Sequence, residues 1–393
     1  MASTPRPCRA EHLGSLLRPA SLLEHADPTT LRKIEDEEIS KIVHEQLKIG
    51  LKAVTDGEYR RSLFFSTFFD NVSGFESVPT DVSGLGLREY LPDVKSLSAW
   101  QFAPRTVVFC TGKIQHSGQS STLDEFRFVQ SVVGRENVSN IKVTIPAPSW
   151  YHFRHKDGRA YASGVYENDK EYLDDLARAF RTELGLLYEA GLRRIQVDDP
   201  HLSYLCSPQI IKDWTADPES IKSPNELLET YIAWYNSCFR DVPSDTEIGI
   251  HICRGNYNEE RFVSSGGYDA IAEQLFQDLN VHTFYLEYDT DRAGGFEPLK
   301  KLPLGKNVVL GLVSTKRVEI EDIEVLRRRV FKAAEFIAQG NGVSVDEALD
   351  RLGVSPQCGF ASHSRENRLS RENMLDKLKL VRELADSIWP GQA

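Results

Sequence analysis

The sequence predicts an α/β fold, a (β/α)8 TIM barrel with an insertion after the second strand. Three observations favour this fold. Eight strand-like segments alternate with amphipathic helical segments along 393 residues, polar residues stand at the ends of those strands, and no low-complexity linker divides the chain. An open doubly wound sheet would also alternate, but the sequence has no glycine-rich phosphate loop after the first strand. We therefore expect residues 1–393 to form a single domain with its site at the carboxyl ends of the strands.

The expected strands are short segments that end in polar or glycine-rich residues. They are residues 9–15, 52–58, 141–147, 194–199, 247–253, 283–289, 307–314 and 354–360. Residues 74–140 are too many for a simple connection. We expect them to form a helical or hairpin insertion that could cover the barrel mouth, with a strand pair near residues 105–113.

Apolar residues at helical spacing fill the intervals between the strands. These stripes run over residues 39–47, 173–187, 227–239 and 323–337. Gly50 follows the first stripe and is typical of a left-handed helix end. Ser344 and Glu347 fit a capping box for a short helix before the last strand.

Composition narrows the class of protein. The chain is 40% hydrophobic and 27% charged, as in soluble globular proteins. A net charge of −11 with dispersed Lys and Arg argues against a nucleic-acid partner. The longest apolar runs fall far short of the roughly 20 residues that a membrane span needs. The two ends carry no signal peptide, prenylation or peroxisomal motif, so we expect a cytoplasmic location.

Six widely spaced cysteines favour free thiols or metal ligands over disulfides. Cys8 is expected in a flexible terminus. In residues 247–253 isoleucines alternate with Gly249, His251 and Cys253, and side chains two apart on a strand point the same way. His251 and Cys253 therefore present an imidazole and a thiolate on one face, half of a zinc site, which Glu287 and Cys358 near the ends of later strands could complete.

Several motifs together resemble one known family. They are His12–Ser15, Thr55–Glu58, Val143–Pro146, Ile195–Pro200, His251–Asn256, Leu286–Gly294 and Ser355–Ser362. Over nearly its whole length the chain resembles the catalytic domain of cobalamin-independent methionine synthase. It is most similar to the short, single-domain members of that zinc-dependent barrel superfamily, which also includes uroporphyrinogen decarboxylase.

The resemblance implies a transferase that moves a methyl group to homocysteine, giving methionine through a zinc-bound thiolate. It implies Zn2+ as the cofactor, held by His251, Cys253, Glu287 and Cys358. Glu287 would leave the metal as the substrate sulfur enters. The partners would be a small-molecule thiol, homocysteine, and an alkyl donor, with no nucleic acid and no membrane; a homodimer stays open.

The same resemblance implies an amino-acid pocket. Ser15 would bind the carboxylate of homocysteine through its backbone, and Glu58 and Asp198 would hold its ammonium, so Asp198 joins Glu287 as a residue of the reaction. Alternatively, Glu58 and Asp198 form salt bridges with arginines. The candidates are Arg60, Arg61 and Arg193. Trp150 would stack on a flat donor or pack at the rim.

Two departures from the family's pattern leave the methyl donor open. Tyr204 stands near the position of a carboxylate that helps to bind folate in the large enzyme, and Ser314 stands nearest the position of a proton-donating histidine after the seventh strand. The donor is thus a methylated folate or another methyl carrier. Asp289 and Arg292 could tune specificity or simply pair within a loop.

Other functions compete with methyl transfer. A zinc thiolate could attack another electrophile such as an epoxide, as in epoxide–coenzyme M transferases. A metal-free decarboxylase would have no use for His251, Cys253 and Cys358. A non-catalytic metal-binding protein would not need the amino-acid pocket of Ser15, Glu58 and Asp198. A zinc ion that serves only as a staple usually has close cysteine pairs as ligands, whereas these ligands come from three strands.

Overall fold

The centre of the computed structural model is a six-stranded parallel sheet in the order β3-β4-β5-β6-β7-β8. The structure describes residues 6–24, 27–79, 85–99, 106–255, 264–361 and 369–392. The strands are β3 (Val143–Pro146), β4 (Arg194–Asp199), β5 (Glu247–Ile252), β6 (Thr283–Glu287), β7 (Asn307–Val313) and β8 (Leu352–Pro356). They are buried almost throughout, as is usual for parallel strands covered on both faces.

Two more segments continue the sheet at its edges. Ala10 forms a parallel bridge with Val354 of β8, and Val54 forms one with Ile141 beside β3. These two segments also meet, because the N–H of Leu16 donates to the carbonyl of Gly57 at 3.0 Å. The α/β class with a parallel sheet is confirmed, while closure into an eight-stranded barrel stays a prediction that these contacts between the edge segments favour.

The first two predicted strands are each reduced to a single bridge. In the second of them, the side chain of Gln46 forms hydrogen bonds with both backbone polar groups of Thr55. Its Nε2 donates to the Thr55 carbonyl at 2.8 Å, and its Oε1 accepts from the Thr55 N–H at 3.0 Å. The helix that precedes this segment thus satisfies backbone groups that a strand ladder would otherwise use. Cys8 is buried beside the first segment, so the prediction of a flexible terminus there was wrong.

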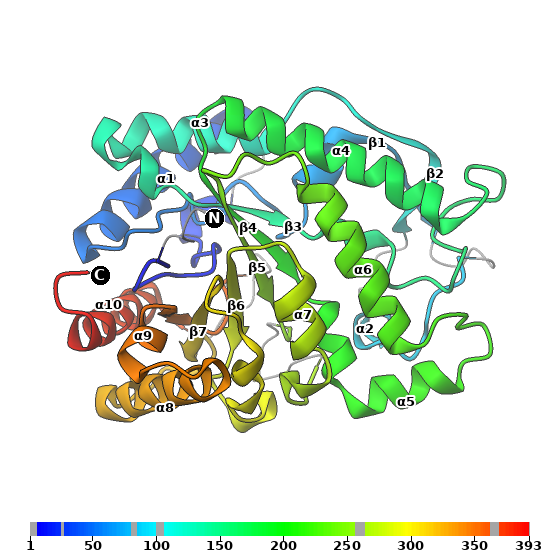
Figure 1. Cartoon of the computed structure of the whole chain (residues 1–393). Coiled ribbons are helices and arrows are strands. Elements are labelled where there is room, and N and C mark those ends of the chain that lie inside the picture. Colours follow the sequence, from blue (N-terminus) through cyan, green and yellow to red (C-terminus); the bar gives the residue numbers. More distant parts are fainter. Residues whose placement is uncertain are drawn as a thin grey trace.

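Helices surround the sheet (Figure 1). They are α1 (Pro28–Ile49), α2 (Pro92–Ala99), α3 (Ser121–Val133), α4 (Asp169–Glu189), α5 (Pro208–Ala216), α6 (Pro224–Phe239), α7 (Ala272–Asp278), α8 (Ile323–Asn341), α9 (Val345–Leu349) and α10 (Arg371–Ile388). The predicted helix ends are confirmed at two points. Gly50 caps α1 with φ 90°, and the N–H of Glu347 donates to Ser344 at the start of α9.

The predicted insertion divides into two parts. The first is an antiparallel pair of β1 (Val72–Pro79) and β2 (Thr106–His116), which confirms the expected strand pair, and α2 lies in the connection between these two strands. The second, α3, packs between α1 and α4 as one of the outer helices. Asp93 of α2 accepts a hydrogen bond from Tyr204 at 3.0 Å and pairs with Arg154 at 2.7 Å. The insertion therefore reaches the loops after β3 and β4, at the carboxyl end of the sheet.

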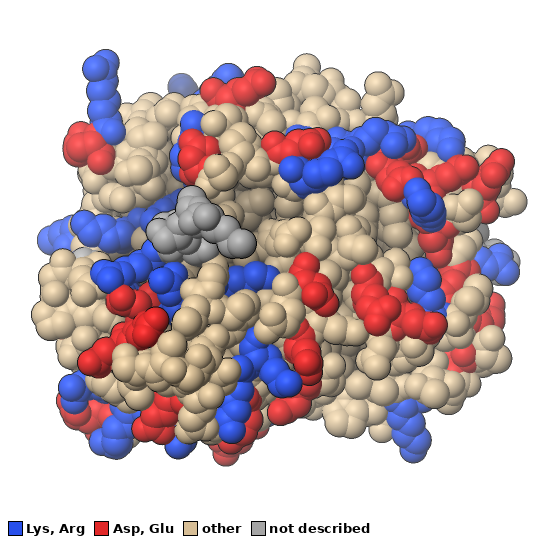
Figure 2. Space-filling model, in the orientation of Figure 1, with Lys and Arg blue, Asp and Glu red and all other residues tan. Residues whose placement is uncertain are grey.

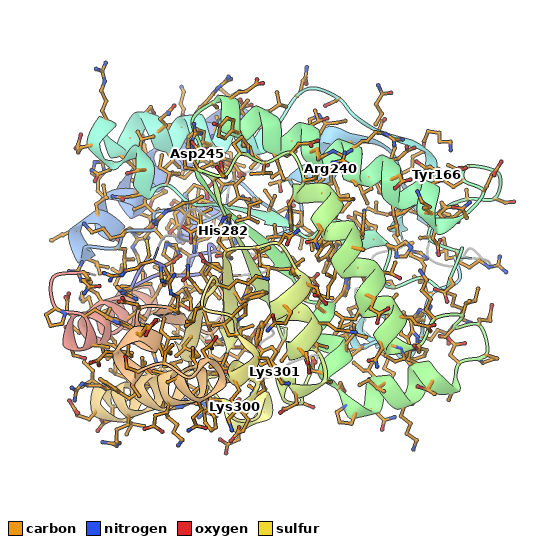
Figure 3. All side chains as sticks on the ribbon, in the orientation of Figure 1. Tyr166, Arg240, Asp245, His282, Lys300 and Lys301 are labelled. Carbon is orange, nitrogen blue, oxygen red and sulfur yellow. The ribbon has the colours of Figure 1, made fainter. Side chains whose placement is uncertain are left out.

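The opposite, amino end of the sheet is marked by Asp245 and His282, which precede β5 and β6 (Figure 3). Positive and negative side chains are interspersed over the face in Figure 2. Among the described residues, no helix combines the length and the apolar character that a membrane span requires.

Candidate metal centre

Four side chains converge at the carboxyl end of the sheet. His251 is in β5 and Cys253 directly follows it, Glu287 is the last residue of β6, and Cys358 lies two residues beyond β8. One ligand atom from each residue lies within 4.8 Å of the others. The two cysteine sulfurs are 3.6 Å apart. Strand alternation and parallel register thus bring together the residues that the sequence singled out.

The surroundings of these donors fit a cation. The Nδ1 of His251 lies 3.4 Å from the carbonyl of Tyr285, an arrangement in which Nδ1 can donate to that carbonyl while Nε2 serves as a metal ligand. That Nε2 is buried without a partner in the described structure. The neighbouring Cys358 and burial raise the pKa of the Cys253 thiol well above its usual range, which a divalent cation would reverse. One imidazole, two thiols and a carboxylate are a donor set that suits zinc.

Glu287 is held by two nitrogen donors. The backbone N–H of Arg254 donates to Oε1 at 2.6 Å, and Nη2 of Arg292 donates to Oε2 at 2.6 Å. The same Nη2 lies 3.2 Å from Oδ1 of Asp289. The loop pair of Asp289 and Arg292 is therefore present, and through Arg292 it also contacts the candidate metal ligand Glu287.

Glu58 lies in a tight turn beside this cluster. Its φ of 59° is left-handed, a conformation that is uncommon for a residue with a side chain. Its N–H donates to Asp56 at 2.8 Å, and Thr144 donates to its Oε1 at 2.8 Å. A Cβ on Gly14 would come within 2.5 Å of that oxygen, so the glycine makes room for the carboxylate.

Asp198 is the register partner of His251 on the adjacent strand. Gln196 donates to its Oδ1 at 2.7 Å. Burial raises the pKa of Asp198 to about 7; His251 opposes this shift and the Glu58 carboxylate adds to it. Burial likewise raises the pKa of Glu58. Two buried carboxyl groups that disfavour each other's charge would both be stabilised by a cationic ligand.

The arginines considered as alternative partners are mostly engaged elsewhere. Arg60 pairs with Asp36 at 2.6 Å, and Arg193 pairs with Asp245 at 2.9 Å. Arg61 lies 3.6 Å from Glu58. Among the described ion pairs, Glu58 therefore has one of these three arginines as a partner, and Asp198 has none.

Ser15 joins the first segment to the loop that carries Cys358. Its carbonyl accepts from the N–H of Phe360 at 2.8 Å, and its Oγ accepts from the N–H of Ala361 at 3.3 Å. A side chain on Gly359 would collide with the Ser15 hydroxyl, so this approach requires glycine. Ser15 therefore lies beside the metal cluster.

Trp150 and Tyr204 are packed in this structure. The Trp150 ring stacks on Phe65 at 4.6 Å and on His201 at 5.1 Å, and it exposes 6% of its surface. Tyr204 is buried and donates to Asp93. A role for these two rings in binding a donor stays a prediction, and it would require a ring face to become accessible.

Lys316 is a residue at this site that sequence reasoning missed. Its Nζ donates to the carbonyl of Gly255 at 2.9 Å, two residues from Cys253. Burial raises the pKa of Asp289, and the charges of Arg292 and Lys316 oppose this shift. Ser314, which the sequence places nearest the position of the family's histidine, accepts from the N–H of Lys316 at 3.2 Å. The available signal was a lysine two residues beyond Ser314, after the same strand. Asn256 and Ser362, at the ends of two motifs, lie outside the described residues.

Comparison with known proteins gives a consistent result. A family model described as the cobalamin-independent synthase catalytic domain matches residues 161–386. The uncharacterized protein YxjH of Bacillus subtilis is 34% identical over 98% of this chain and 95% of its own length. A methionine synthase of Saccharolobus solfataricus is 24% identical over 94% of each chain.

Solved structures agree with these relatives. The putative vitamin-B12 independent methionine synthase from Listeria monocytogenes is 30% identical, with a TM-score of 0.70 over 98% of this chain and 99% of that one. A B12-independent methionine synthase from Shewanella, 19% identical over 98% of this chain and 95% of that one, shares the fold with a TM-score of 0.65. None of the four proteins named here is described as an epoxide-opening enzyme or a decarboxylase.

Proposed function

The chain belongs to the family of the cobalamin-independent methionine synthase catalytic domain, a family of methyltransferases, and we propose that it methylates homocysteine at a zinc ion. The observation that carries this proposal is the convergence of four donor atoms within 4.8 Å of one another at the carboxyl end of the sheet. The residues that would hold the ion are His251, Cys253, Glu287 and Cys358. When bound, zinc would lower the pKa of the homocysteine thiol, so that the thiolate reacts near neutral pH.

The chain's own side chains would orient homocysteine. Glu58 and Asp198 would hold its ammonium, because their buried carboxyl groups gain from a cation between them. Ser15, beside the Cys358 loop, would bind its carboxylate through the backbone. The ligands come from three separate strands, whereas structural zinc sites use close cysteine pairs. This spread favours a reactive centre over a staple.

The methyl carrier would enter on the side of Trp150 and Tyr204. Its leaving atom keeps the electron pair of the broken bond to carbon, and a nitrogen leaving group then takes up a proton. Lys316 is our candidate to supply that proton, because its ammonium lies against Gly255 next to the cluster. Whether the carrier is a methylated folate or another methyl compound is the part of the proposal that the experiment must decide.

The first experiment is metal analysis of the purified, reduced protein by mass spectrometry. We expect about one zinc per chain in the wild type, and loss of zinc in Cys253→Ser and Cys358→Ser. Cys238→Ser is the matched control, because Cys238 is buried in α6 outside the cluster. Absence of zinc after reconstitution would overturn the proposal.

The second experiment is turnover by the zinc-loaded protein. Homocysteine is mixed with methyl-labelled carriers, beginning with methyltetrahydrofolates of one and three glutamates, and labelled methionine is detected by mass spectrometry. Cobalt-substituted protein gives an independent readout, since a thiolate bound to cobalt adds a charge-transfer band. Cys253 and Cys358 already give such a band in the cobalt protein, so the readout is the increase on adding homocysteine. A protein that contains its metal but shows no increase would refute homocysteine as the acceptor, whatever the carrier.

A further inference from the structure

We propose that Arg292 is a positioning residue that makes Glu287 the exchangeable ligand of the metal centre. This inference rests on the proposed function and goes beyond it. Glu287 is completely buried, so water cannot stabilise its carboxylate when it is not bound to a metal. Any release of Glu287 from an ion therefore requires a partner inside the protein.

The structure supplies that partner. Nη2 of Arg292 donates to Oε2 of Glu287 at 2.6 Å, while the N–H of Arg254 donates to Oε1 at 2.6 Å. Both are charge-assisted hydrogen bonds, which are about twice as strong as neutral ones. Because each of them uses electron density that a metal would also use, they compete with the ion for the carboxylate.

Asp289 keeps the guanidinium in place. Its Oδ1 lies 3.2 Å from the same Nη2, and it exposes only 2% of its side chain. Arg292 is itself 8% exposed at the side chain, so neither partner is freely solvated. The Arg292 cation is thus anchored whether or not Glu287 is bound to the metal.

The cysteine ligands are held differently. The hydrogen bond to Cys253 Sγ comes from the neutral backbone N–H of Gly255 at 3.4 Å, and Cys358 Sγ faces Cys253. A cationic side chain thus competes for Glu287, whereas a weak neutral donor contacts the Cys253 sulfur. If a substrate thiolate displaced Glu287 from a bound ion, the carboxylate would keep the Arg292 charge beside it.

The sign of the effect separates this role from general damage to the site. Removing a residue that merely supports the centre would weaken zinc binding. Removing Arg292 frees Glu287 to bind the ion more strongly, so zinc affinity should rise. Homocysteine affinity should fall, because the displaced carboxylate would have lost its partner.

The experiment measures zinc dissociation constants by competition with a chromophoric chelator, on the full-length protein. In Arg292→Met we expect zinc to bind about tenfold or more tightly than in the wild type, since a hydrogen bond to a charged group is worth at least this factor. Arg292→Lys should change in the same direction by less, and it serves if the Met variant does not fold. Arg329→Met is the matched control, because Arg329 donates to the carbonyl of Tyr288 and lies over the ring of Phe296, with no hydrogen bond to Glu287 in the described part of the chain.

A double-variant cycle tests the coupling directly. In the Glu287→Gln background, Arg292→Met should leave zinc affinity unchanged, because the carboxylate that it releases is absent. Unchanged or weaker zinc binding in folded Arg292→Met or Arg292→Lys would overturn the inference. Homocysteine titration of the cobalt-substituted wild type tests the proposed function separately. No increase of the thiolate band there refutes homocysteine, while the zinc affinities still decide the role of Arg292.

Discussion

Replacing Asp198 by asparagine tests whether the pocket beside the metal centre holds an amino-acid ammonium. Asparagine has nearly the same shape and keeps an oxygen to accept the 2.7 Å hydrogen bond from Gln196, so the change removes charge with little change in packing. Asp198 is not among the four candidate ligands, so zinc content should stay at the wild-type value. Affinity for the amino acid should fall.

The expected loss of affinity in Asp198→Asn follows from the burial of Asp198 and from the pKa of its carboxyl group. A hydrogen bond to a charged group contributes about 1.5–3 kcal/mol, equal to roughly 10–150-fold in affinity. Burial raises the pKa of Asp198 to about 7 in the ligand-free protein. The carboxyl is then about half ionised at pH 7, and a proton competes with the ammonium at lower pH. Wild-type affinity should therefore rise about tenfold from pH 6 to pH 8, and the asparagine variant should lack this rise.

The assay is isothermal titration of the zinc-free protein with methionine at pH 6, 7 and 8. Methionine carries the ammonium and carboxylate of homocysteine but has no thiol that titrates. Zinc-free protein is used because a bound dication would lower the pKa of Asp198. Glu183→Gln is the matched control, since Glu183 is a fully buried carboxylate that accepts from Ser120 at 2.6 Å and lies on α4. If Asp198→Asn binds methionine as tightly as the wild type at pH 8, the ammonium assignment is refuted.

Three further predictions address the metal, the Glu58 turn and acid stability. Chelating zinc should lower the thermal midpoint of the wild type by several degrees but leave that of Cys358→Ser unchanged, because a bound ligand stabilises only a protein that binds it; equal shifts in both proteins would contradict the metal site. Gly14→Ala should lower the free energy of unfolding by roughly 2–5 kcal/mol in urea titrations. The reason is that φ of Gly14 is 105° and the new Cβ would lie 2.5 Å from Glu58 Oε1. A variant as stable as the wild type would show that this carboxylate can move. Burial lowers the pKa of His155 to about 4. Between pH 6.5 and 4 the unfolded state therefore binds the additional proton, and the wild type should lose about 3 kcal/mol of stability that His155→Gln does not lose; parallel pH profiles of the two proteins would refute this.

Local patterns were sufficient for much of the fold. Strand alternation in β5 predicted that His251 and Cys253 share a face, and the apolar stripe before Gly50 predicted where α1 ends. Both are short-range effects: the side-chain period of a strand and the left-handed helix end depend on neighbouring residues alone.

Other features depend on residues far apart in the chain. The predicted strand at residues 52–58 is a single bridge because Gln46 bonds the backbone of Thr55. Cys8 is buried because the first segment pairs with β8 rather than remaining flexible. Trp150 is packed because the rings of Phe65 and His201 meet on it. None of these contacts leaves a periodic signal in the sequence.

The sequence by itself determined the alternating order of strands and helices, the residue types of the candidate metal ligands, and the family to which the chain belongs. It did so because periodicity, helix caps and motif spacing are local properties of the chain. Only the tertiary structure decided which charges face the candidate ligands: Arg292 on Glu287, Lys316 beside Cys253, and Glu58 beside Asp198. Those neighbours set the electrostatics of the site, and they meet only because parallel strands place the ends of distant segments at one edge of the sheet.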